Sequence, residues 1–172
     1  MGKALDGQVA IITGGGRGQG RADAVALATL GARIVLCDVP AALASVRYEL
    51  GTAEDLDLTV SLVKEAGSEA IAVPADVRDP VAVARVADAA LAAFGQIDIL
   101  VANAGIVSTG KVRELPLSDE ILGRRFAAHH PIPRPWIYPE DVAREVVHLV
   151  TEPGNITGTV IEIGLGQSAR MH

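Results

Sequence analysis

A cluster of glycines between two apolar segments constrains the fold of this chain more than any other feature. The stretch IITGGGRGQGRADAVALATLG, residues 11–31, carries six glycines in and after a junction with the pattern of a strand followed by a helix. Glycine is unfavourable inside either element because it loses more backbone entropy on folding than any other residue. Its concentration at Gly14, Gly18 and Gly20 therefore indicates a tight turn that another group approaches closely.

Strand-like and helix-like segments alternate along the first hundred residues. Thr52 and Asp79 are predicted N-caps, and Gly31, Gly67 and Gly95 are predicted helix ends. Parallel strands need crossover connections of right-handed sense. The order therefore predicts an α/β fold, a Rossmann-like doubly wound parallel sheet with helices on both faces. The predicted strands are 8–13, 33–38, 70–74 and 97–102, and the predicted helices are 19–30, 53–66 and 80–94.

The pattern is less regular after Gly105. A short helix is predicted at 119–127, a proline-rich segment follows, and Pro139 opens a helix at 139–151. The run GTVIEI predicts a last strand at 158–163. We expect a single domain over residues 1–172, in which 1–107 is one half, 108–138 is irregular, and 139–172 holds the C-terminal helix and strand.

Composition limits the class of protein. Hydrophobic residues make up 49% of the chain and aromatic residues 3%, so the core is built from Ala, Val, Ile and Leu. The net charge of −6, without a Lys/Arg cluster, argues against a nucleic-acid partner. The N-terminal segment has no long apolar run, which predicts neither a secretory signal nor a membrane anchor. Cys37 is the only cysteine, which fits a reducing, cytoplasmic location.

The glycine turn has the properties of a phosphate cradle. Its spacing is Gly14-x-x-x-Gly18-x-Gly20, directly after a strand and at the start of a helix. Unpaired N–H groups and the positive end of the helix dipole favour a phosphate there, and glycine leaves room for it. Asp38 ends the second strand, eighteen positions beyond Gly20, where a carboxylate can accept hydrogen bonds from ribose hydroxyls. Together they predict a dinucleotide site; the alternative is a flexible glycine loop without a ligand.

Two residues bear on which dinucleotide is bound. The carboxylate of Asp38 would repel a 2′-phosphate, whereas the guanidinium of Arg17 could pair with one. Because the carboxylate sits at the ribose itself, we expect NAD rather than NADP.

Three motifs in order resemble those of the short-chain dehydrogenase/reductase family over residues 5–107. Thr13 to Gly20 match its TGxxxGxG turn, Asp76-Val77 match its Asp-Val pair near the adenine, and Asn103-Ala104-Gly105 match its NAG motif. The long loop after Asp38 resembles an actinobacterial-type subgroup that often holds NAD tightly. The predicted cofactor site comprises residues of the turn and of these motifs: Gly14, Arg17, Gly18, Gln19, Gly20, Asp38, Asp76, Val77, Asn103, Ala104 and Gly105.

The resemblance implies oxidoreductase activity on an alcohol or carbonyl substrate, but the catalytic part of the family pattern is not present. The family uses a Ser, a Tyr-x-x-x-Lys helix and an Asn. Here Tyr48 precedes Thr52 by four positions, Tyr138 precedes Val142, and no lysine follows Lys111. The segment between Gly105 and Pro139 is too short for the family's fifth and sixth strands and their helices. We therefore expect this middle part to be absent and assign no catalytic residue.

Replacement chemistry has weak candidates. Ser108 and Thr109 follow the NAG motif but fit ordinary turn residues better. His129 and His130 are adjacent, and His148 has no partner at ligand spacing, so no metal site is predicted. Trp136 and Tyr138 could line a substrate mouth or anchor an irregular segment, and Asp76 fits a cofactor contact better than a catalytic acid.

The missing middle affects the sheet and the function. Without its usual neighbour the fourth strand is an open edge. The last strand can dock there, giving the order 3-2-1-4-last, or the edge can pair with another copy as a homo-oligomer. Three functions stay open: an oxidoreductase with non-standard catalytic groups, a NAD-binding module without catalysis, and a truncated, inactive product.

Overall fold

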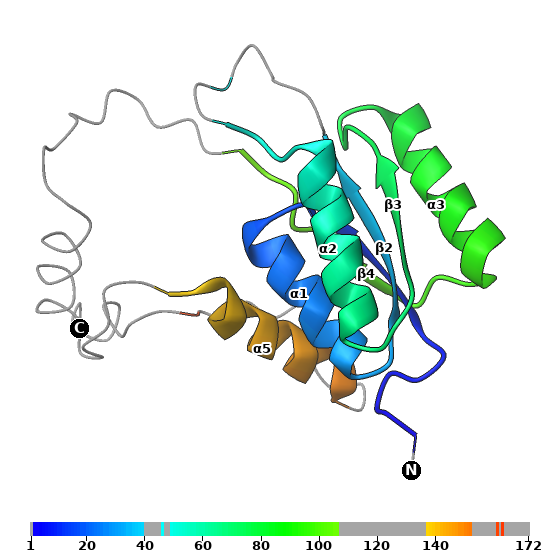
Figure 1. The fold of residues 1–172 in the computed structure, drawn as a ribbon, viewed down its shortest axis with the longest axis vertical. Helices are drawn as coiled ribbons and strands as arrows, with labels where there is room; N and C mark the ends of the chain where they lie inside the picture. The colour runs from blue at the N-terminus through cyan, green and yellow to red at the C-terminus, as the bar shows by residue number, and fades with distance from the viewer. Residues whose placement is uncertain are drawn as a thin grey trace, which may run out of the picture.

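The computed structural model describes residues 2–39, 46, 49–106, 137–152, 161 and 163. Within these ranges the predicted alternation of strands and helices is confirmed (Figure 1). The strands are β1 (Val9–Thr13), β2 (Arg33–Asp38), β3 (Ala70–Pro74) and β4 (Ile99–Val101). The helices are α1 (Gly18–Thr29), α2 (Ala53–Glu65), α3 (Pro80–Phe94) and α5 (Pro139–Thr151).

The four strands form one parallel sheet in the order β3-β2-β1-β4, as predicted. The predicted last strand, 158–163, lies outside the described residues except for positions 161 and 163, and the short helix at 119–127 lies wholly outside them. The docking of a fifth strand beside β4 therefore stays a prediction.

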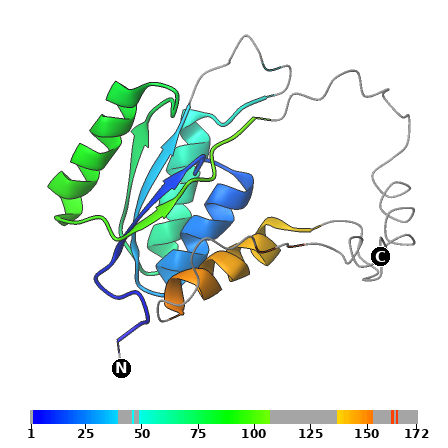
Figure 2. The ribbon, with the colours of Figure 1, turned by 180° about the vertical axis from the view of Figure 1, so that it is seen from behind.

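Helices cover the two faces of the sheet unequally. α1, α2 and α5 lie on one face and α3 lies on the other (Figure 2). Alternate side chains of the strands enter two separate cores, as expected for a sheet buried on both faces. In β1, Ala10 and Ile12 face the α1 side, whereas Val9 and Ile11 face α3.

Local signals set the ends of the helices. Thr52 caps α2 by accepting the Asp55 N–H at 3.1 Å, and the Asp55 carboxylate accepts the Thr52 N–H at 3.1 Å, which completes a capping box. Asp79 caps α3 by accepting the Val81 N–H at 2.9 Å. Gly31, Gly67 and Gly95 have positive φ and lie at the ends of α1, α2 and α3, as predicted.

β4 is shorter than the predicted strand 97–102. At its start the Asp98 carboxylate, rather than a backbone carbonyl, accepts the Val9 N–H at 2.7 Å. At its end the chain turns toward β1, because both the Asn103 and Ala104 N–H groups donate to the Thr13 hydroxyl at 3.0 Å. Regular strand pairing is thus confined to Ile99–Val101.

Candidate functional site

A cleft of about 430 Å³ opens where the carboxyl ends of the strands meet the glycine turn. Nine of the eleven predicted cofactor residues line it; Gln19 and Gly20 do not. Such a crevice at the carboxyl ends of parallel strands is the usual ligand site of doubly wound folds. The lining residues come from four loops: Gly14, Arg17, Gly18, Asp38, Val39, Leu50, Gly51, Ala75, Asp76, Val77, Arg78, Asn103, Ala104, Gly105 and Ile106.

The three motif glycines are needed for different physical reasons. A Cβ on Gly20 would lie 2.2 Å from the Gly14 carbonyl oxygen, so this position allows the first turn of α1 to pack against the end of β1. Gly14 has φ +68°, and its Cβ would lie 2.9 Å from the Asn103 side-chain nitrogen. Gly18 has φ +54°, and a Cβ there would meet no atom within 4 Å. Gly18 therefore faces the open cleft and is not part of a packed contact.

Asn103 holds the turn against β4. Its side-chain nitrogen donates to the carbonyls of Thr13 at 2.9 Å and Gly14 at 3.2 Å. The Thr13 hydroxyl accepts the Asn103 N–H and itself reaches the Val101 carbonyl at 3.4 Å. The Thr and Asn of the two motifs therefore fix one wall of the cleft.

Asp38 stands at the edge of the cleft with both oxygens facing backbone donors. Its Oδ2 accepts the Gly16 N–H at 3.0 Å, and its Oδ1 accepts the Val39 N–H at 2.8 Å. Neither bond uses a charged donor, so the carboxylate remains a negative group in the cleft. Arg17 also lines the cleft, and its guanidinium donates to the Glu49 carbonyl at 2.5 Å.

Asp76 forms an ion pair that the sequence analysis missed. Arg78 donates to it from Nε at 3.0 and 3.1 Å, from Nη2 at 2.6 Å and from its backbone N–H at 2.9 Å. These hydrogen bonds lower the pKa of Asp76 to about 2. Asp76 is therefore ionised at neutral pH and unsuited to donating a proton. The Asp-x-Arg spacing is the only sequence signal for this pair.

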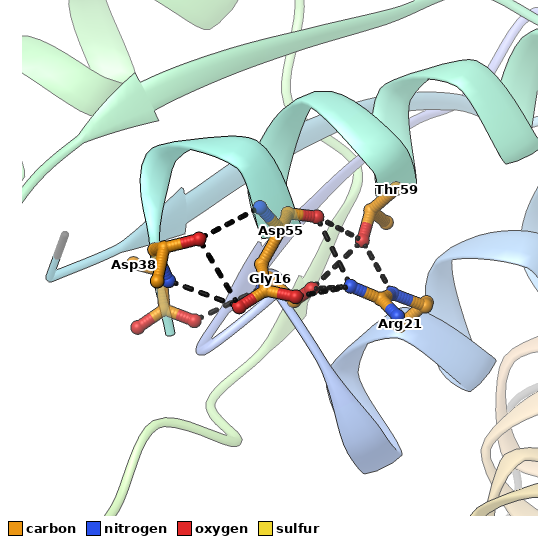
Figure 3. A network of polar contacts seen from close by, with 6 residues as sticks. Gly16, Arg21, Asp38, Asp55 and Thr59 are labelled. Atoms are coloured by element: carbon orange, nitrogen blue, oxygen red, sulfur yellow. Dashed lines mark hydrogen bonds and ion pairs between the residues drawn. The ribbon is translucent and has the colours of Figure 1, made fainter. Parts of the chain in front are cut away.

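Arg21, Asp55 and Thr59 form a second polar group beside the turn (Figure 3). Arg21 donates to the Asp55 carboxylate at 3.1 Å and to the Thr59 hydroxyl at 2.9 Å, and its Nη2 also reaches the Gly16 carbonyl. Their sequence separation of 34 to 38 residues gives no local pattern that would have revealed them.

Several predicted candidates lie outside the described residues, namely Ser108, Thr109, His129, His130 and Trp136. Tyr138 precedes α5 and is exposed, away from the cleft lining. His148 is half-exposed, with Nδ1 3.7 Å from a Glu152 oxygen.

No group of three His, Cys, Asp or Glu residues suited to a metal occurs among the described residues. None of the described helices is long and apolar enough to cross a membrane.

Comparison with known proteins shows a consistent set of relatives. The family model described as short chain dehydrogenase matches residues 8–122. The (−)-trans-carveol dehydrogenase of Rhodococcus erythropolis is 47% identical over 104 residues, which cover 60% of this chain and 38% of that protein. The chain spans between 38% and 51% of the length of curated relatives that it matches.

Two crystal structures share the fold. A short chain dehydrogenase from Mycobacterium paratuberculosis bound to NAD aligns with a TM-score of 0.58 and 43% identity, over 61% of this chain and 39% of that one. Carveol dehydrogenase from Mycobacterium avium in complex with NAD aligns with a TM-score of 0.61 and 36% identity, over 70% of this chain and 43% of that one.

Proposed function

The chain belongs to the short-chain dehydrogenase family, and from that premise we propose that its cleft binds a nicotinamide dinucleotide, NAD in preference to NADP. The proposal rests on one observation: Asp38 and Gly18 line the same cleft, and the wall at Gly18 is open. In an adenosine diphosphate, the phosphates suit the N–H groups of a helix N-terminus, and the ribose hydroxyls suit a carboxylate beside it. The NAD in the two aligned structures supports the same choice.

Each part of the cleft would contact a different part of the cofactor. The N–H groups at the start of α1 would hold the pyrophosphate, since they have no partners inside the helix. Asp38 would accept the ribose hydroxyls, and Asp76-Val77 would border the adenine. Asn103, Ala104 and Gly105 would lie toward the nicotinamide. Bound there, the nicotinamide would supply hydride transfer with an alcohol or carbonyl compound, the family's substrate class.

We propose that these 172 residues bind the cofactor without supplying the proton transfer of the family reaction. No Tyr-x-x-x-Lys occurs in the sequence, and Asp76 is held as a carboxylate by Arg78. General acid–base assistance is typically worth about 10²–10⁴-fold in rate. A dehydrogenase whose proton relay comes from other groups is the second candidate, supported by the family membership.

Isothermal titration of the purified chain with NAD and with NADP tests the cofactor proposal. Asp38→Ala should weaken NAD binding about tenfold or more, because hydrogen bonds to a charged group are lost. NADP binding should change less, since the repulsion of its 2′-phosphate is also removed. Asp57→Ala is the matched control, because it removes an exposed carboxylate of α2 that is not among the lining residues. Absence of NAD binding by a folded wild-type chain would refute the proposal.

An alcohol and ketone panel, followed by absorbance of the reduced cofactor, separates the two functional candidates. NAD binding without turnover supports a binding module. Turnover that persists in Gly18→Val, which should close the cleft, would point to a contaminating enzyme rather than to this chain.

A further inference from the structure

One residue of the glycine turn, Gly16, is held through both its backbone N–H and its backbone carbonyl. The Gly16 N–H donates to Asp38 Oδ2 at 3.0 Å, and the Gly16 carbonyl accepts from the Thr59 hydroxyl at 3.0 Å and from Arg21 Nη2. Thr59 is fully buried in α2. Figure 3 shows these groups converging on Gly16 from α1, α2 and the end of β2.

The Arg21 guanidinium connects the turn to the start of α2. Beside Gly16 it contacts Thr59 through Nε at 2.9 Å, the Asp55 carboxylate at 3.1 Å and the Asp55 carbonyl at 3.2 Å. Asp55 is also the capping-box partner of Thr52, which directly follows Gly51 in the cleft wall. The hydrogen bond from Thr52 and the charge of Arg21 lower the pKa of Asp55, so the pair is ionic at neutral pH.

This arrangement matters because four residues of the turn have no side chain that could hold it in place. Gly14, Gly15, Gly16 and Gly18 carry no side chains, and ordering glycine costs more conformational entropy than ordering other residues. A turn ordered before the ligand arrives avoids that cost at the moment of binding. Arg21 does not line the cleft, so any influence on a ligand is indirect, through the backbone that it holds.

We propose that Arg21, Asp55 and Thr59 are positioning residues that preset the glycine turn for the pyrophosphate of the cofactor. The inference rests on the proposed dinucleotide site and adds to it three residues that do not touch the ligand. It also explains why the guanidinium bonds to a backbone carbonyl, a carboxylate and a hydroxyl at once, which a lysine ammonium cannot match in fixed geometry.

The test is a set of dissociation constants for Arg21→Met, measured with NAD, ADP and adenosine. Loss of the ordered turn should weaken NAD and ADP by about tenfold, as expected if the competent turn falls to about a tenth of the molecules. Adenosine, which lacks a pyrophosphate, should change by less than about threefold. Arg144→Met is the matched control, because Arg144 forms an ion pair with Asp141 on α5 and lies outside the cleft. It should leave all three constants unchanged.

Two further variants separate positioning from general stability. Thr52→Ala removes the α2 cap but keeps Arg21 and its partners, so it should lower the free energy of unfolding without changing the ADP constant. Arg21→Lys keeps the charge, and it tests the positioning role of Arg21 if Arg21→Met does not fold. It should show an intermediate loss, and wild-type affinity for both NAD and ADP in Arg21→Lys and Thr59→Val would overturn the inference.

Hydrogen exchange of the unliganded protein completes the design. The amides of residues 14–18 should exchange faster in Arg21→Met than in the wild type and in Arg144→Met. Unchanged exchange overturns the inference. If the wild type binds neither NAD nor ADP, the proposed function fails, and the exchange experiment still decides whether these residues order the turn.

Discussion

Asp23 is a carboxyl group that the fold removes from solvent. It is fully buried in α1, and neither oxygen has a partner within the described part of the chain. Burial raises its pKa to about 6 from the usual 3.8. The folded protein therefore binds this proton more tightly than the unfolded chain does, so this group favours folding at low pH. Its contribution to stability falls as the pH rises from about 4 to about 6.

Asp23→Asn should accordingly raise the free energy of unfolding at pH 7 and above by roughly 1–3 kcal/mol. The gain should shrink to nearly zero below about pH 3, where both states carry the proton. Urea unfolding of the wild type and of Asp23→Asn across that pH range measures this gain. Asp57→Asn, at an exposed position on α2, should show no such trend. A gain independent of pH would show that ionisation of Asp23 is not the cause.

The glycine turn makes a contrasting prediction at two neighbouring motif positions. Alanine at Gly20 would place its Cβ 2.2 Å from a backbone oxygen, which cannot move without shifting β1 or α1. We expect Gly20→Ala to cost roughly 2–4 kcal/mol of stability. Gly18→Ala meets no atom and should cost only the strain of a positive φ, about 1–2 kcal/mol. Denaturant unfolding compares them, and equal costs would contradict the packing role assigned to Gly20.

At the scale of the elements, the sequence was sufficient to predict the structure where residues close along the chain determine it. Thr52 with Asp55, Asp79 with Pro80, and the glycines after three helices act within about four residues, and those helix ends agree with the prediction. β4 is shorter than the predicted strand because the Asp98 carboxylate competes with the backbone for the Val9 N–H. These two residues are 89 positions apart in the sequence. Arg21 with Asp55 and the burial of Asp23 likewise depend on tertiary contacts, which a periodic pattern does not encode.

α5 packs along α1 and covers the core on that face of the sheet. Its Val146, Val147 and Val150 pack against the same buried core as Ile99 and Val101 of β4. Ala143 is its one buried residue. Ala143→Glu should therefore lower the free energy of unfolding by roughly 2 kcal/mol or more, since it inserts a charge into that contact.

The matched control for α5 is Leu149→Glu, on the exposed side of the same helix. Its cost should stay within about 0.5 kcal/mol. Urea titrations followed by circular dichroism measure both variants. Similar midpoints for the two would show that α5 does not dock on α1 in solution.

For the whole molecule, the unequal covering of the sheet has a visible consequence. On the α1 side, Ile99 and Val101 are partly buried against the core, whereas on the α3 side Leu100 is 65% exposed. In the described part of the chain β4 pairs with β1 alone. An exposed apolar side chain on a strand without a second neighbour favours association with another chain.

Leu100→Lys should therefore reduce self-association and leave the fold intact. Because Leu100 is already largely hydrated, the substitution should change the free energy of unfolding by less than about 1 kcal/mol, and a charge at an open strand opposes pairing. Ile99→Lys, on the opposite face, should cost several times more because its side chain packs against the core. Sedimentation velocity over a concentration series measures the association, with Leu58→Lys, exposed on α2, as the control for removing surface leucine in general. If Leu100→Lys and Leu58→Lys sediment alike at every concentration, the exposed face of β4 is not where copies of the chain meet.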